Sequence, residues 1–123
     1  MIDGNFYTIV ARHESDPLHI RCDVEFNVDH EIFKAHFPGN PIVPGVCSLE
    51  IIRQMATALL GGVIRIPSVK NMKFINVMTP AKGKLFTFDI QLVAQSDSQY
   101  SAKATISDAD AIVVKASLLC EKH

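Results

Sequence analysis

Hydrophobic and polar residues alternate along several stretches of the chain, a pattern typical of strands that bury one face. A hairpin turn is expected at residues 107–110, because serine and aspartate favour tight turns. Strands are expected at residues 18–28, 86–92, 100–106 and 112–120, with weaker candidates at 6–12 and 68–77.

Residues 46–60 follow a different pattern, with apolar side chains around most of a helical circumference. Pro44 favours the start of a helix there, and the pair Gly61 and Gly62 favours its end. Because so few of its residues are polar, this helix is expected to be buried on nearly all sides. The pattern alone therefore predicts an α+β fold with one central helix.

The length of 123 residues suits a single domain with one core. A hydrophobic content of 48% is high for a small monomer and predicts apolar surface that a partner subunit covers. No apolar run approaches the ~18 residues of a membrane-spanning helix, and residues 1–5 do not resemble a signal peptide. The three cysteines lack metal-ligand spacing and are odd in number, which favours a reducing cytoplasm.

The segment from His36 to Val46 reads His-Phe-Pro-Gly-Asn-Pro-Ile-Val-Pro-Gly-Val. Three of the six prolines and two of the six glycines fall between Pro38 and Gly45. Proline fixes its own φ and glycine permits a tight bend, so the loop is expected to be stiff and sharply shaped. It delivers an imidazole at one end and a helix at the other.

Together with Glu50 and Gln54, this segment resembles the active-site signature of the beta-hydroxyacyl-acyl-carrier-protein dehydratases, hot-dog-fold enzymes of fatty-acid and polyketide synthesis. The resemblance implies a hot-dog fold over residues 1–123, with an antiparallel sheet wrapped around the central helix. It also implies a cofactor-independent hydro-lyase that converts a 3-hydroxyacyl thioester to the trans-2-enoyl thioester, as a homodimer or larger homo-oligomer. Ten positions over nineteen residues stand in register: His36, Phe37, Pro38, Gly39, Pro41, Pro44, Gly45, Val46, Glu50 and Gln54.

Elimination of water needs a base for the C2 proton, an acid for the departing hydroxyl and a polarised thioester carbonyl. His36 suits the base, because imidazoles titrate near neutral pH. Glu50 suits the acid, directly or through a water, because an apolar surrounding raises the pKa of a carboxyl. The alternatives are a histidine bonded by backbone in a turn, and a plain pair within the helix between Glu50 and Arg53 or Gln54. The resembled enzymes usually carry a small or apolar residue where Arg53 stands, so the protonation state of Glu50 stays open.

The start of the helix is the expected binding site for the thioester oxygen, because the N–H groups of Gly45 and Val46 lack acceptors within the helix. Phe37 is expected to contact substrate, and Gln54 to orient Glu50. In the resembled enzymes the histidine and the acid come from different chains of a dimer. Plausible walls of an acyl tunnel, or else ordinary core, are Phe37, Met72, Phe74 and Met78.

Cys47 is interpreted as a buried helix residue and not as a nucleophile, because no basic activator is evident beside it. The other histidines fit no metal spacing, and the chain has no dinucleotide or phosphate motif. No metal or cofactor is therefore expected.

The net charge of −1 gives no reason to expect binding to nucleic acid or membrane, but its distribution is uneven. Residues 51–88 contain six basic residues and no acidic one, which can steer an acidic partner. The resemblance supplies one, an acyl carrier protein bearing a phosphopantetheine-linked acyl chain. The alternative is that these lysines only solvate a sheet edge. The expected docking residues are Lys70, Lys73, Lys82 and Lys84.

Two other functions remain open on the sequence. One is an acyl-ACP or acyl-CoA thioesterase of the same fold, in which Glu50 activates water. The other is a non-catalytic subunit that binds the carrier protein. Both are less favoured because neither requires His36 and Glu50 together.

Overall fold

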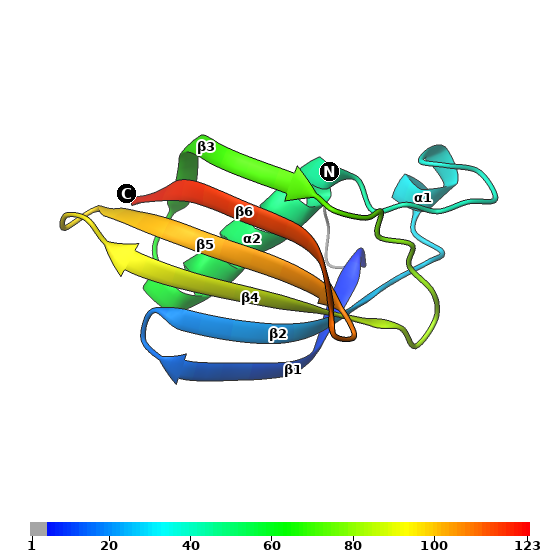
Figure 1. The fold of residues 1–123 in the computed structure, drawn as a ribbon, viewed down its shortest axis with the longest axis horizontal. Helices are drawn as coiled ribbons and strands as arrows, with labels where there is room; N and C mark the ends of the chain where they lie inside the picture. The colour runs from blue at the N-terminus through cyan, green and yellow to red at the C-terminus, as the bar shows by residue number, and fades with distance from the viewer. Residues whose placement is uncertain (1–4) are drawn as a thin grey trace.

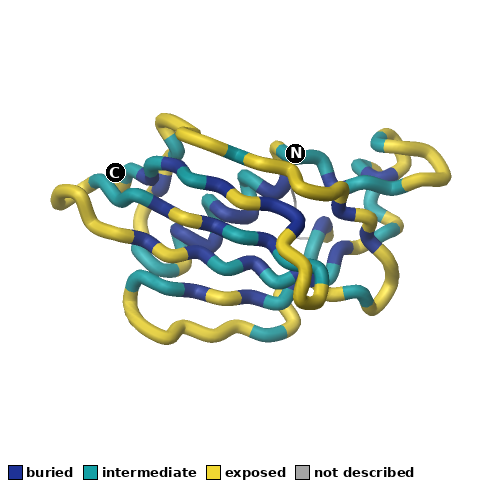
Figure 2. Tube along the Cα trace, viewed as in Figure 1, coloured by how far each residue is buried: buried dark blue, intermediate teal, exposed yellow. Residues whose placement is uncertain are grey.

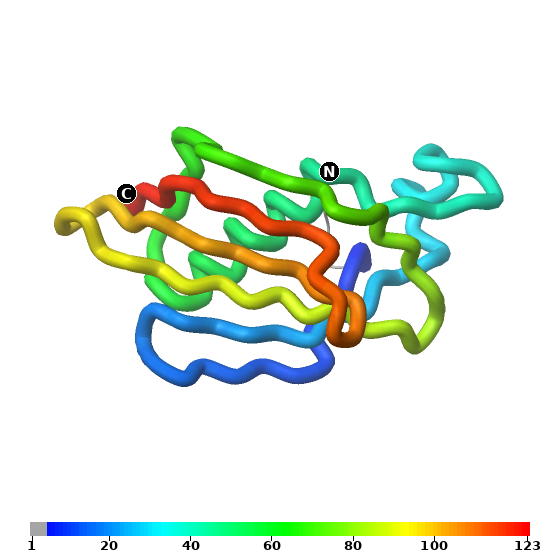
Figure 3. The backbone as a smooth tube through the Cα atoms, in the orientation of Figure 1, coloured from blue at the N-terminus to red at the C-terminus, as the bar shows by residue number. Residues whose placement is uncertain are grey.

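The computed structural model describes residues 5–123, which form six strands and two helices. All six strands belong to one antiparallel sheet with the order β1-β2-β4-β5-β6-β3, and α2 lies across one face of it (Figures 1 and 3). This is the arrangement expected of a hot-dog fold. In chain order the elements are β1 Tyr7–Asp16, β2 His19–Phe26, α1 Glu31–Ala35, α2 Gly45–Leu60, β3 Ile64–Phe74, β4 Leu85–Ala94, β5 Gln99–Asp108 and β6 Ala111–Lys122.

The core lies between α2 and the sheet and is built from alternate residues of the strands. In β4, for example, Phe86, Phe88 and Ile90 are fully or almost fully buried, while their neighbours are not. Figure 2 shows the same alternation along β2, β4, β5 and β6, whereas β1 and β3 are mostly exposed. Burial of each such side chain stabilises the fold by about 1.5–3 kcal/mol. The alternation confirms the strand pattern predicted for β2, β4, β5 and β6.

Helix α2 begins and ends close to the predicted positions. It starts at Gly45 after Pro44 and ends at Leu60, where the N–H of Gly61 bonds the carbonyl oxygen of Thr57 at 2.8 Å. The expectation that it is buried on nearly all sides is wrong for the single chain, because the sheet covers only one side of it. Val46 is 61% exposed, and the buried positions are Cys47, Ser48, Ile51, Ile52, Met55 and Ala56.

Three local predictions need correction. Strand β3 spans Ile64–Phe74 instead of residues 68–77, because register shifts between Arg65 and Ser68 and between Val69 and Asn71 hide its period in the sequence. The β5–β6 turn is narrower than residues 107–110: β5 continues to Asp108, and the turn lies at Ala109, which has a φ of 52°, and Asp110. The five-residue helix α1 was not predicted, because it is too short to show a period.

Within residues 5–123 no helix is long and apolar enough to cross a membrane. The interpretation that the N-terminus is not a signal peptide rests on residues 1–5, and residues 1–4 lie outside the described part of the chain.

Candidate active site

The loop after α1 holds His36 by its backbone. The His36 N–H donates to the Ile32 carbonyl at 2.9 Å, and the His36 carbonyl accepts from the Ile42 N–H at 3.1 Å. Between these bonds, Phe37 and Asn40 exchange backbone hydrogen bonds of 3.3 and 2.9 Å. Gly39 adopts a φ of 73°, a conformation that glycine reaches without strain. The stiff loop expected from the sequence is thus closed upon itself by hydrogen bonds.

The imidazole of His36 stacks on the ring of Phe37, with 4.2 Å between the ring centroids. Its Nδ1 atom is buried and has no hydrogen-bond partner within the described chain. Buried polar atoms are nearly always paired in folded proteins. The unpaired Nδ1 argues against the alternative of a histidine bonded by turn backbone.

Glu50 is half-buried on α2 and forms a two-point ion pair with Arg53, one turn further along. Arg53 Nε donates to one carboxylate oxygen at 2.6 Å and Nη2 to the other at 2.8 Å, while Nη1 bonds the Ile64 carbonyl at 3.2 Å. Gln54 donates to the same carboxylate at 3.1 Å. The Arg53 hydrogen bond lowers the pKa of Glu50, and burial only partly opposes this effect. Glu50 is therefore a carboxylate at neutral pH, which answers the question that Arg53 raised in the sequence.

A tyrosine from the first strand completes this network. The Tyr7 hydroxyl donates to the side-chain oxygen of Gln54, which fixes the orientation of the amide that reaches Glu50. Burial is the main cause that raises the pKa of Tyr7; the ionisable groups of Cys22 and Glu50 add to this effect, and Arg53 opposes it. Sequence reasoning did not find Tyr7, because 47 positions separate it from Gln54 and no local signal connects them.

The start of α2 presents its backbone as expected. The Pro44 carbonyl accepts from the N–H groups of Cys47 and Ser48, at 3.0 and 3.3 Å. In residues 5–123 no hydrogen bond occupies the N–H groups of Gly45 and Val46. Gly45 also permits close packing, because a Cβ at this position would lie 2.7 Å from Cζ of Phe74.

The proposed tunnel walls divide into two groups. Phe37 and Phe74 are about half exposed, at 47% and 56%, and Met72 is half-buried. Met78 is ordinary core at 3% exposure, and its sulfur accepts a hydrogen bond from Ser48 at 3.7 Å. Phe74, which touches the helix start, is thus better placed to meet a ligand than Met78.

Cys47 is buried, and burial raises the pKa of its thiol, which agrees with its interpretation as a structural residue. Across residues 5–123 no three His, Cys, Asp or Glu side chains are grouped so that they could hold a metal ion.

The described chain does not pair the two catalytic candidates: the carboxylate of Glu50 is bonded to Arg53 and Gln54, and no hydrogen bond joins it to His36.

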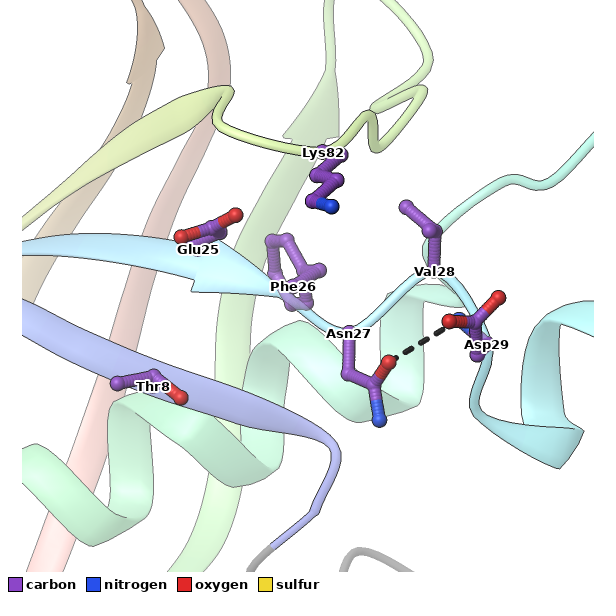
Figure 4. A pocket seen from close by; sticks show the side chains of 7 residues that line it. All are labelled: Thr8, Glu25, Phe26, Asn27, Val28, Asp29 and Lys82. Carbon is purple, nitrogen blue, oxygen red and sulfur yellow. Dashed lines mark hydrogen bonds between the residues drawn. The ribbon is translucent and has the colours of Figure 1, made fainter.

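The four predicted docking lysines do not form one group. Lys70 and Lys73 lie on β3, while Lys84 pairs with Asp108 at 3.0 Å. Lys82 lines a pocket of about 300 Å³ together with Glu25 and Asp29 (Figure 4).

Comparison with known proteins adds a family and a fold. A family model described as ApeI-like, ApeI dehydratase, matches residues 11–115. The 3-hydroxyacyl-[acyl-carrier-protein] dehydratase FabZ of Levilactobacillus brevis is 29% identical, over 93% of this chain and 83% of its own length. FabZ of Legionella pneumophila is 30% identical, over 75% of this chain and 67% of its own length.

Two solved structures share the fold. The one described as the dehydratase heterocomplex ApeI:P from Xenorhabdus doucetiae has a TM-score of 0.75 at 16% identity, covering 94% of this chain and 97% of that one. A hypothetical thioesterase with coenzyme A from Streptococcus pneumoniae has a TM-score of 0.67 at 11% identity, covering 95% and 88%. At these identities the likeness concerns the fold alone, and it confirms the hot-dog arrangement.

Proposed function

We propose, from the premise that this chain belongs to the ApeI-like dehydratase family, that it eliminates water from a 3-hydroxyacyl thioester carried by an acyl carrier protein. The ten-position signature supports this most strongly, because it holds an imidazole with an unpaired nitrogen and a helix start with two free N–H groups. The FabZ relatives, which are named for that reaction, favour the same substrate. The three cysteines are free and buried, which fits the reducing cytoplasm that we propose as its location.

The thioester carbonyl would bind at the start of α2. There the N–H groups of Gly45 and Val46 donate to its oxygen and stabilise the negative charge that develops when C2 loses a proton. Phe37 and Phe74, both partly exposed, would cover the adjacent acyl chain. His36 is the base that takes the C2 proton, because a neutral imidazole suits proton abstraction and the loop backbone holds this half-buried residue in place.

Glu50 would act as a carboxylate, since the Arg53 guanidinium holds it ionised. It accepts a hydrogen bond from the 3-hydroxyl of the substrate and turns that oxygen toward His36. The imidazolium then returns its proton to the oxygen as the C3–O bond breaks and the C2–C3 double bond forms. One water leaves, and neither His36 nor Glu50 has gained or lost a proton over the cycle. In this proposal Glu50 positions the substrate hydroxyl, whereas the sequence prediction has it supply the proton directly or through a water.

The site would be shared between two chains of a homodimer. Support comes from strand β3, which forms an open edge of the sheet. Large apolar side chains are also exposed on the β3 edge and near the start of α2, where a second chain would cover them: Val46, Phe74, Ile75 and Val77.

The roles are tested with His36→Ala and Glu50→Gln. Each is expected to lower the dehydration of a 3-hydroxyacyl pantetheine thioester by at least ~100-fold, as for removal of a positioned catalytic group, with an unchanged circular dichroism spectrum. His13→Ala, which changes an exposed histidine of β1, is the matched control and should keep normal activity. A Glu50→Gln protein with near-normal turnover would contradict the role of Glu50.

The same two variants test the shared site. Heterodimers formed by subunit exchange would contain one intact site and one doubly altered site, so activity should recover toward half of the wild-type value. Absence of recovery in proven heterodimers would place both groups within one chain.

A further inference from the structure

The outer face of the sheet, away from α2, carries four exposed lysines on three neighbouring strands: Lys70 and Lys73 on β3, Lys115 on β6 and Lys103 on β5. This face is turned toward the viewer in Figure 1, where α2 lies behind the strands. Lys103 is flanked by the buried residues Ala102 and Ala104, so its side chain points outward. We call these four residues the basic groove.

The strands bring the basic groove together by register. Lys73 lies directly opposite Lys115, and Ser117 lies opposite both Lys103 and Asn71. The surface between them is hollowed into two adjoining depressions of about 830 and 380 Å³. Besides the four lysines, their polar lining consists of amide and hydroxyl side chains, from Ser68, Asn71, Gln95, Ser101, Thr105 and Ser117.

No carboxylate lines either depression, and none of the four lysines joins an ion pair within residues 5–123. The acidic residues of the outer face lie on β2, on β4 and at the end of β6, and they have partners of their own. On β6, Glu121 accepts from Gln99 at 3.0 Å and pairs with His123 at 2.8 Å. Asp89 bonds His19 at 2.8 Å, Asp23 accepts from Thr87 at 2.7 Å, and Glu25 accepts from the Gly83 N–H at 2.7 Å. The positive charge of the basic groove is therefore not neutralised from within the chain.

The arrangement also has an energetic cost. Like charges directly opposite each other on neighbouring strands, as in Lys73 and Lys115, destabilise a sheet. An anionic partner that covers the two lysines would relieve this repulsion and add attraction. The basic groove should therefore gain more free energy from binding an acidic surface than a face with balanced charges would.

We propose that the basic groove is the docking surface for the acidic acyl carrier protein, an inference that rests on the proposed function. Lys73 and Phe74 are neighbours at the end of β3, and their side chains point to opposite faces of the sheet. The Phe74 ring touches Gly45 at the expected thioester site, so the phosphopantetheine arm of a carrier on the outer face would pass around this end of β3. A carrier seated on β3, β5 and β6 would thus lie beside the end of β3 that leads to the helix start. The docking surface contains Lys103 and Lys115, which the sequence prediction omitted. It excludes Lys84, paired with Asp108, and Lys82, which faces a pocket lined by two carboxylates (Figure 4).

The test uses fluorescence anisotropy with labelled carrier protein that lacks its phosphopantetheine arm and so cannot enter the active site. The double variant Lys103→Glu/Lys115→Glu should bind at least about tenfold more weakly than wild type at low salt, since charge reversal turns attraction into repulsion. The difference should shrink toward ~0.5 M salt, where the Debye length falls below that at physiological ionic strength, about 8 Å. The matched control Lys82→Glu should bind within about twofold of wild type, because it lies outside the basic groove.

Equal binding by the double variant and wild type would overturn the proposal, as would an equal loss with Lys82→Glu. If the basic groove instead binds acidic residues of a second copy, the double variant will change the sedimentation coefficient and leave carrier binding intact, which also overturns the proposal. A separate assay with a short 3-hydroxyacyl pantetheine thioester should give wild-type turnover for the double variant. If neither wild type nor the double variant dehydrates this substrate, the proposed function fails. The binding measurement still decides whether the basic groove is the docking surface.

Discussion

Replacing Arg53 with alanine separates the two possible roles of Glu50, because it removes the group that keeps the carboxyl ionised. The change deletes two hydrogen bonds to Glu50 and one to the Ile64 carbonyl. Exposed ion pairs contribute about 0.2–1 kcal/mol, and hydrogen bonds to charged groups about 1.5–3 kcal/mol. With side-chain exposures of 34% and 27%, this pair lies between these cases. We expect Arg53→Ala to lower the unfolding free energy by about 1 kcal/mol and the Tm by about 4 °C.

The pH dependence gives the sharper readout. Arg53 lowers the pKa of Glu50 in the folded state, so the stabilisation is present above the ordinary carboxyl pKa of about 4.3 and is lost as pH falls through the lowered value. Among described residues, the charged or ionisable groups that act on Glu50 are Arg53 on α2 and Tyr7 on β1. Without Arg53, burial still raises the pKa of Glu50, and among the described residues only the hydrogen bond from Gln54 lowers it. The difference in unfolding free energy between wild type and Arg53→Ala should therefore be largest near pH 7 and should shrink as the pH falls through the lowered pKa of Glu50.

Catalysis should follow the same sign. If Glu50 works as a carboxylate, kcat/KM of Arg53→Ala should drop below that of wild type as the pH is lowered. The acidic limb of its pH profile should lie at higher pH than that of wild type. Arg53→Lys, which keeps the charge without the two-point contact, should lie between them, and Arg65→Ala, an exposed arginine on β3, should match wild type. An Arg53→Ala enzyme that is faster than wild type at pH 5–6 would refute this reasoning and make Glu50 the proton donor.

Further predictions concern Gly45 and the cysteines. A methyl group at Gly45 would meet the partly exposed ring of Phe74. Gly45→Ala should therefore lower the unfolding free energy from thermal denaturation by no more than about 1 kcal/mol and yet raise KM. Phe74→Leu in the same chain should restore KM. A KM unaffected by Gly45→Ala would contradict the placement of substrate at the helix start. Burial raises the pKa of Cys120 to about 11, so at pH 8 its alkylation by iodoacetamide, followed by mass spectrometry, should be on the order of 100-fold slower than in urea. Equal rates would mean that the thiol is not buried in solution.

The sequence predicted the strands with regular alternation well, since burial of one face imposes a period of two on β2, β4, β5 and β6. It misjudged β3, where bulges interrupt that period, and missed α1, which is one turn long. The loop from His36 and the start of α2 were readable because proline and glycine fix local backbone geometry.

Contacts between distant segments were not readable. The bond from Tyr7 to Gln54 joins β1 to α2, and the basic groove takes Lys103 and Lys115 from strands that only the sheet order places beside β3. The pairing of Arg53 with Glu50 was foreseen as an alternative, because their spacing puts them on one helix face. Its two-point geometry and the added bond to Ile64 needed the structure.

The central claim is that this chain dehydrates a carrier-bound 3-hydroxyacyl group. It is tested most directly by incubating the purified protein with a panel of 3-hydroxyacyl carrier proteins of different chain lengths and following the intact carrier by mass spectrometry. We expect the mass of the carrier to fall by one water with the wild-type protein and to stay unchanged with His36→Ala. A carrier that loses its whole acyl chain would show thioester hydrolysis, and a carrier that is bound but unchanged across the panel would show a non-catalytic subunit; either result would contradict the account.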